Sequence, residues 1–189
     1  NNRSIFQGLV GIGVTSPGYN LDVVGSIKAS VQGRFASGSA ATPSYSFDAD
    51  SDSGMFRATT NALGFSTAGT EKMRIDSNGN VGINVVAQNS SATWRNFQLG
   101  GGNVVTRAST GNGMLLGTGF IFTSADTELY KNTAATSRVY FNNDEIRFQN
   151  AASGTAGSAI TWNETMRILA NGNVGIGTDS PDAKLEVDG

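Results

Sequence analysis

Residues 164–189 read ETMRILANGNVGIGTDSPDAKLEVDG, and this stretch decides the fold. Apolar and polar residues alternate in its TMRI and KLEV segments. A period of two residues places one row of side chains on a buried face and the other in water, so both segments are predicted strands. Asn171-Gly172 lies between the first strand and a short Val-Gly-Ile strand, and Asn-Gly favours a tight type I′ hairpin turn. A sharp corner between strands of different sheets uses the same residues and stays an alternative.

Proline and glycine residues are the other structural signals in this unit. Ser180-Pro181 interrupts strand pairing, because proline has no amide proton to donate. Gly175 and Gly177 flank Ile176. A strand tolerates glycine where it bulges or where another backbone comes close, and we favour a neighbouring chain packed against these glycines.

The unit recurs along the chain. EKMRIDSNGNVGIN (71–84) matches residues 164–177 at ten of fourteen positions, and LVGIGVTSPGYNLDVVG (9–25) matches residues 173–189 at nine of seventeen. A repeating sequence is typical of an array rather than of a single catalytic cleft. We divide the chain into a first unit (1–30), a second block (31–84), a β-rich knob or irregular segment (85–163) and a third unit (164–189).

The pattern elsewhere also predicts an all-β chain with little helix, since no long segment keeps a period of 3.6 without Gly, Asn or Pro. We expect short strands at 55–57, 63–65, 73–75 and 145–148, and turns at 52–54, 60–61 and 68–69. Glycine makes up 25 of 189 residues and large apolar residues are scarce. A chain so poor in core material is expected to complete its core with other subunits.

Composition narrows the function classes. The net charge is −2 without a basic run, which argues against nucleic-acid binding. No apolar run is long enough for membrane insertion. The absence of cysteine leaves the redox compartment open, and without histidine as well the common nucleophilic triads and zinc sites are excluded. The chain begins with Asn-Asn rather than Met, which indicates a processed or partial chain.

The segment SYSFDADSDSGMFRATTNALGFSTAGTEKMRIDSNGNVGI (44–83), followed by the Val-Gly-Ile-Gly-x-x-Ser-Pro-x-x-x-Leu-x-Val unit, resembles the shaft repeats of bacteriophage tail fibres and tailspikes. The clearest matches are Phe47 to Ile83 and Asn171 to Val187. Short Gly-Ile-Gly repeats also occur in bacterial surface proteins. The resemblance implies an elongated homotrimeric β-shaft, prism-like or a triple β-helix, with a possible small β-knob.

Two departures from the resemblance stand out. The middle copy, Gly82-Ile83-Asn84, lacks the Ser-Pro loop, so we expect the shaft to be interrupted there. The self-cleaving chaperone domain that often follows such repeats is not seen after Gly189; it is cleaved off, lies outside this stretch or is missing from this fibre.

Carboxylate side chains are the first candidates for a metal-binding or catalytic role. Asp48, Asp50 and Asp52, with Gly54, resemble the start of a calcium loop, but Ser53 intervenes and Thr59 stands where a closing glutamate belongs. A solvated turn is the simpler interpretation. These aspartates, or Asp126 with Glu128, also have the spacing of a glycosidase carboxylate pair, which chance often produces.

Aromatic residues are the second candidate. Trp94, Tyr130, Tyr140 and Trp162 offer flat rings that stack on sugars of a host surface, or they serve as core and subunit-interface residues. Glu–Arg pairs recur three residues apart, at 71 and 74 and at 164 and 167. Such residues point to opposite faces of a regular strand, so an ion pair within the chain is doubtful; a contact across subunits or a solvated face is expected.

The resulting hypothesis is a non-enzymatic structural segment of a virion tail fibre without cofactors. Its expected partners are two further copies of itself, other virion tail proteins and host-surface glycan, with no nucleic acid and no membrane. The alternatives are a tailspike fragment that hydrolyses host polysaccharide with aspartates, and a bacterial surface adhesin.

Overall fold

The computed structural model describes residues 6–88, 93–107 and 113–189. The chain forms two units, Asn1–Ala36 and Ser37–Gly189, which are described separately below. The described residues form strands and no helix, so the predicted all-β class and low helix content are confirmed. These units do not decide the four-part division drawn from the sequence, which stays a prediction.

The first unit contains one parallel strand pair. β1 (Val10–Ile12) and β2 (Leu21–Val23) pair in parallel, with Val10 opposite Leu21 and Ile12 opposite Val23. Val24 N donates to Ile12 O at 2.9 Å and extends the pairing. The connection between the strands contains the Ser-Pro pair of this copy, as the pattern predicts.

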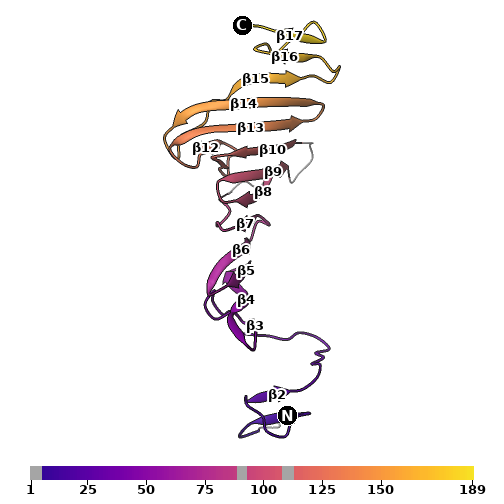
Figure 1. Ribbon diagram of the computed structural model, residues 1–189, viewed down its shortest axis with the longest axis vertical. Coiled ribbons are helices and arrows are strands. Elements are labelled where there is room, and N and C mark those ends of the chain that lie inside the picture. Colours follow the sequence, from indigo (N-terminus) through magenta and orange to yellow (C-terminus); the bar gives the residue numbers. More distant parts are fainter. Residues whose placement is uncertain (1–5, 89–92, 108–112) are drawn as a thin grey trace. The chain divides into compact units, whose positions relative to one another are not determined.

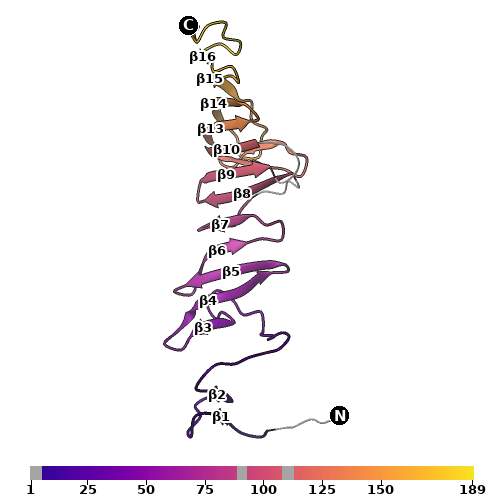
Figure 2. The same cartoon turned by 90° about the vertical axis from the view of Figure 1, so that its right-hand side faces the viewer.

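The second unit is a sheet of 13 strands that follow one another in chain order (Figures 1 and 2). Neighbouring strands are antiparallel, except for the parallel pairs β7–β8 and β16–β17. A separate antiparallel pair, β11–β12, lies between β10 and β13 in the sequence. The strands are β3 (Tyr45–Phe47), β4 (Asp50–Thr59), β5 (Ala62–Thr67), β6 (Thr70–Ile75), β7 (Val81–Ile83), β8 (Trp94–Leu99), β9 (Gly102–Arg107), β10 (Gly113–Thr118), β11 (Phe120–Phe122), β12 (Glu128–Tyr130), β13 (Ala134–Asn142), β14 (Glu145–Gly154), β15 (Asn163–Ile168), β16 (Val174–Ile176) and β17 (Leu185–Val187).

All four predicted strand segments lie inside β4, β5, β6 and β14, and the turns at 60–61 and 68–69 are confirmed. The turn predicted at 52–54 is wrong. Asp52, Ser53 and Gly54 lie within β4, and the chain turns instead at 48–49, where Phe47 pairs with Asp50. The Asp-Ser-Gly composition marks a register shift in the β3–β4 ladder here rather than a chain reversal.

Asn171-Gly172 forms a hairpin, with β15 and β16 antiparallel in one sheet. The turn is not the expected two-residue type I′ turn, because within this loop only Gly172 takes a positive φ, of 79°. Gly172 N donates to Leu169 O at 2.8 Å, and Leu169 N donates to Asn173 O at 2.9 Å. The loop therefore has three residues, with glycine at the left-handed position that closes it.

The sheet contains the same four-strand block twice. β4–β5–β6–β7 and β13–β14–β15–β16 share their pairing pattern, so that Met73 opposite Ile83 corresponds to Met166 opposite Ile176. Both blocks end in a parallel strand, β8 after the first and β17 after the second. The middle copy is therefore not interrupted: it keeps the parallel crossover without the Ser-Pro pair, and Asn84, at φ 52°, takes the place of glycine.

The loop of each crossover passes over the strand that precedes it. A Cβ on Gly11 would lie 2.6 Å from Val14 O, and a Cβ on Gly175 would be nearer still to Thr178 O. A Cβ on Gly82 would likewise lie too close to Val85 O. The prediction that another backbone comes close to Gly175 is confirmed. That backbone is the loop of the same chain, so the prediction that a neighbouring chain packs there was wrong. These glycines let a short connection join parallel strands.

A second layer covers one part of the sheet. Phe120 and Phe122 of β11 pack on Trp94, Val105 and Leu115 of β8, β9 and β10. The rings of Trp94 and Phe122 stack 5.2 Å apart, and Phe120 meets Trp162 edge-on at 5.8 Å. This aromatic cluster is the main packed core of the described residues, and it positions the side chains considered next.

Candidate functional site

A row of apolar side chains crosses the sheet from β5 to β17. Each of the eleven strands contributes one residue, and each residue pairs with the next in register, which puts all of them on the same face. The central row consists of Leu63, Ile75, Val81, Phe97, Val104, Leu116, Val139, Phe148, Met166, Ile176 and Val187.

Two flanking rows widen this surface. They stand two residues along the strands, so they share the same face. One flank, on β4 to β8, consists of Met55, Phe65, Met73, Ile83 and Leu99. The other, on β10 to β17, consists of Met114, Phe141, Ile146, Ile168, Val174 and Leu185. We call the three rows together the apolar face.

The apolar face is open to solvent in the single chain. None of its residues is buried, and Phe97 is 39%, Ile176 40% and Val187 65% exposed. Contiguous exposed apolar surface of this kind marks an interaction site, because monomeric soluble proteins seldom present it.

The opposite face of the sheet is the buried one. Trp94, Val105 and Leu115 lie on it beneath β11, and glycine and polar side chains occupy other parts of it. Gln98 is fully buried and Asn103 is 5% exposed. The β7–β8 loop covers part of this face, where Gln88 N donates to Gln98 Oε1 at 3.0 Å. β11 covers another part, where Asn103 Nδ2 donates to Phe120 O. The chain's own loops thus cover the face that holds the aromatic cluster and leave the apolar face uncovered.

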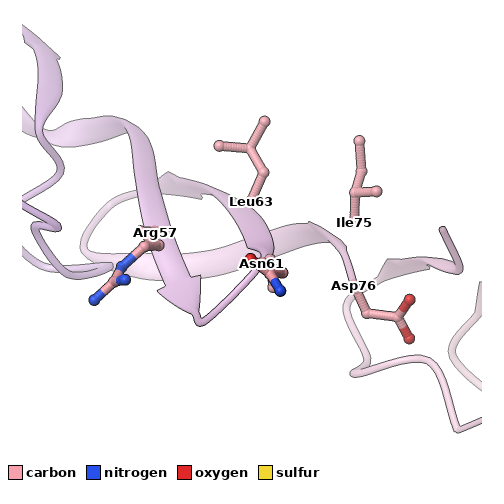
Figure 3. Close-up of a pocket in the computed structure, with 6 residues that line it drawn as sticks. Arg57, Asn61, Leu63, Ile75 and Asp76 are labelled. Carbon is pink, nitrogen blue, oxygen red and sulfur yellow. The ribbon is translucent and has the colours of Figure 1, made fainter. Parts of the chain in front are cut away.

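A shallow groove of about 430 Å³ lies along the β4–β6 end of the apolar face (Figure 3). Leu63 and Ile75 point to the same side of the sheet, away from Asp76 at the end of β6 (Figure 3). Arg57 and Asn61 complete the lining from β4 and its turn. The groove has an apolar wall with charged groups only at its rim, which suits another apolar surface better than a polar ligand.

The candidate calcium residues lie on an open strand. Asp48 is in the β3–β4 turn, and Asp50 and Asp52 begin β4, all of them exposed. An extended strand does not wrap oxygen ligands around a cation as a calcium loop does. Among the described residues, no three acidic side chains gather closely enough to hold a metal ion.

Asp50 and Asp52 nevertheless interact. The hydrogen bond between the two carboxyl groups raises the pKa of Asp52, with smaller contributions from desolvation and the charge of Asp50. The pKa of Asp50 is lowered, first by its hydrogen bond with the Ser53 side chain and then by the one with Asp52. The two groups therefore influence each other's titration, and Asp52 takes up a proton before Asp50 as the pH falls.

The four candidate aromatic residues all lie at or beside the packed cluster. Trp94 is 5% and Tyr130 is 7% exposed. Tyr130 packs its ring on Gly154 and donates its hydroxyl to Ala152 O at 2.7 Å. Tyr140 and Trp162 are partly buried against the cluster. This placement favours a core role for the Trp94 and Tyr130 rings.

A charged group at the edge of the cluster was not anticipated from the sequence. Arg138 lies 4.1 Å from the ring centre of Trp162 and 5.3 Å from that of Tyr140. Its guanidinium donates to Glu128 and, through Nε at 2.7 Å, to Gln149. Burial lowers the pKa of Arg138, although the neighbouring Glu128 opposes this effect. No local signal pairs Arg138 with Glu128, because strands β12 and β13 bring them together.

Glu128 is engaged twice. Its carboxylate accepts from Arg138 and also from the indole nitrogen of Trp162. The Asp126–Glu128 pair considered for glycoside hydrolysis therefore includes one carboxylate that is already held by two donors, which suits binding rather than proton transfer.

The repeated Glu–Arg pairs form ion pairs within the chain, so the prediction that they point apart was wrong. Arg167 Nε donates to Glu164 Oε1 at 2.6 Å. The register skips Thr165, and this extra residue turns Glu164 onto the same side as Arg167. The same arrangement, with the skip at Lys72, joins Glu71 and Arg74 at 2.7 Å.

Comparisons with models of protein families and with curated proteins found no match to this chain. In the part of the chain that the structure describes, no helix has the length and hydropathy needed to cross a membrane.

Proposed function

We propose that the chain is a non-enzymatic structural segment of a bacteriophage tail fibre or similar virion fibre, assembled as a homotrimer. In this role it supports, or itself performs, attachment to the host surface. The proposal rests on the resemblance of Phe47–Ile83 and Asn171–Val187 to shaft repeats and, above all, on the exposed apolar face of the sheet.

The exposed apolar face is the observation that carries the proposal. Eleven strands that neighbour one another in the sheet present apolar side chains to solvent, while β11 and the chain's own loops cover parts of the other face, where the aromatic cluster lies. Covering one such half-exposed side chain contributes on the order of 1 kcal/mol, and the rows contain more than twenty of them. Copies that packed their apolar faces together would supply the core that a single chain lacks.

The number of copies follows from the resemblance, which implies three. Three sheets around one axis would each cover the apolar face of a neighbour and form a prism-like shaft. The remaining partners in this proposal are other proteins of the virion tail and host-surface glycan, with neither nucleic acid nor membrane involved. The place of action is the virion tail fibre.

The assembly is tested by the mass of the purified chain in solution. Light scattering after gel filtration should give three times the 19.6 kDa of one chain. Leu116→Glu, in the central row, should abolish the trimer, because a buried carboxylate would stand on the shared axis. Val86→Glu is the matched control: Val86 is 51% exposed but lies in the β7–β8 loop, away from the apolar face, so this variant should stay trimeric. A stable folded wild-type monomer contradicts the proposal.

The location is tested separately. Antibodies raised against the purified chain should decorate the tail fibres of the parent particle in negative-stain micrographs. Labelling of a bacterial cell surface instead would favour the adhesin alternative.

A further inference from the structure

A pocket of about 350 Å³ opens beside the aromatic cluster. Its floor is apolar and consists of Trp94, Leu115 and Phe122. Its polar wall is supplied by Glu128, Arg138 and Tyr140, and Asp126 and Thr127 stand exposed at its rim. A concave pocket with an apolar floor and a few convergent polar groups is the usual form of a ligand site.

This pocket lies on the face of the sheet opposite the apolar face. Trp94, Leu115 and Arg138 alternate along β8, β10 and β13 with residues of the central row, such as Leu116 and Val139, and so point the other way. Copies that assemble through their apolar faces therefore leave the mouth of this pocket open to solvent.

The charges in the pocket select the class of ligand. The place that a cationic ligand would take above the aromatic rings is already filled by Arg138, which lies over Trp162 and Tyr140. Two carboxylates, from Asp126 and Glu128, outnumber this one guanidinium and disfavour an anion. The excess carboxylate also attracts a small cation, and the choline arm of the test below decides between the two; the apolar floor favours an uncharged ligand that offers both hydroxyl groups and an apolar surface.

We propose that this pocket binds a neutral saccharide. The carboxylate of Asp126 accepts hydrogen bonds from sugar hydroxyls at the rim, and the apolar floor contacts the C–H face of the ring. The inference deepens the proposed function, because it gives the fibre its own point of contact with host-surface glycan. It does not depend on the number of copies, since all the residues of the site belong to one chain.

Tryptophan fluorescence tests the proposal directly. The chain has two tryptophans; Trp94 lies in the floor of the pocket and Trp162 stacks on Arg138, so the signal reports on this site. The full chain is titrated with glucose, galactose, mannose and N-acetylglucosamine, as free sugars and as short oligomers, and with choline and glucuronate as charged probes. We expect a saturable change with at least one neutral sugar and none with choline or glucuronate.

Matched variants locate the binding. Asp126→Asn should weaken it at least tenfold, and asparagine tolerates the left-handed backbone of this position, whose φ is 57°. Asp144→Asn makes the same change at an exposed position in the β13–β14 turn and should leave the affinity unchanged.

Three results overturn the proposal: no response to any neutral sugar, a response confined to a charged probe, or equal affinity of Asp126→Asn and the wild type. A trimer that binds no sugar refutes the pocket alone, whereas a monomer that binds sugar refutes the assembly alone.

Discussion

Gly11, Gly82 and Gly175 occupy the same place in three crossovers, and in each case a carbonyl oxygen three residues later lies where a side chain would begin. Glycine is needed at this point because of space rather than because of a left-handed backbone. The Val-Gly-Ile repeat therefore keeps its glycine because another part of the backbone packs directly against it.

Gly175→Ala should destabilise the folded chain by about 1–3 kcal/mol, because the new methyl group displaces the loop at Thr178. Thermal unfolding followed by circular dichroism measures the loss. Gly101→Ala is the control, since no atom lies within 4 Å of the position that its new methyl group would take, and it should unfold at nearly the wild-type temperature. Equal effects of the two substitutions would contradict the packing argument.

The Asp50–Asp52 pair makes a prediction about pH. Because the pKa of Asp52 is raised and that of Asp50 is lowered, Asp52 takes up its proton first as the pH falls. Asp50→Asn removes the largest cause of the shift, so the pKa of Asp52 should fall towards its usual value. Carboxyl carbon NMR measures both titrations, and an unchanged Asp52 titration in this variant would show that the two groups do not interact.

At the scale of elements, the parallel crossover is the part of the unit that tolerates most variation. The copies that end in β2 and β17 place Gly13 and Gly177 in a left-handed conformation after the first strand, and the copy that ends in β8 uses Asn84 at φ 52°. Asparagine adopts this conformation more readily than other non-glycine residues. The middle copy therefore keeps the geometry of the repeat although it lacks the Ser-Pro pair.

Asn84→Val should lower the stability by about 1–2 kcal/mol or more, since a β-branched residue is strained at a positive φ. Asn84→Gly should be neutral or stabilising. Urea unfolding of the two variants separates backbone strain from the loss of the asparagine side chain, because both variants lack that side chain. A Gly variant as unstable as the Val variant would refute the strain argument.

The bulges at Lys72 and Thr165 show how one skipped residue changes a surface. Strict alternation would separate Glu164 from Arg167, and the bulge brings them together. A double-mutant cycle with Glu164→Gln and Arg167→Gln should give a coupling energy of about 0.5–1 kcal/mol, since the pair is largely shielded from solvent but not fully buried. A coupling near zero would make the pair incidental.

At the scale of the molecule, the chain buries one small aromatic core and leaves three rows of apolar side chains exposed, which is unusual for a soluble monomer. If the apolar face is covered by other copies, folding and association are linked by mass action. The melting temperature should then rise with protein concentration, on the order of a few °C for each tenfold increase. Differential scanning calorimetry over a hundredfold concentration range measures this. A melting temperature independent of concentration, in a reversible transition, would contradict linked assembly.

Much of the fold was accessible from the sequence because its signals are local. Period-two alternation predicted the strands, Asn-Gly predicted the hairpin, and the repeat predicted that residues 71–84 and 164–177 share one structure. The same alternation indicated which residues of each strand share a face, but not how the strands align with one another. The wrong predictions concern places where the chain skips a residue or folds back on itself: the register shift at 52–54, the Thr165 bulge, the three-residue loop at Gly172, the crossover that follows Gly82 and the loop above Gly175.

The sequence by itself determined the all-β class and the repeat, because alternation and turn chemistry act between residues close in the chain. Only the tertiary structure decided which backbone lies on Gly175, that Arg138 joins Glu128 and Trp162 at one pocket, and that the apolar rows of separate strands align into one exposed face. The physical reason is that these features depend on the summed register of many ladders, in which a single bulge reverses the side on which every later residue of a strand lies.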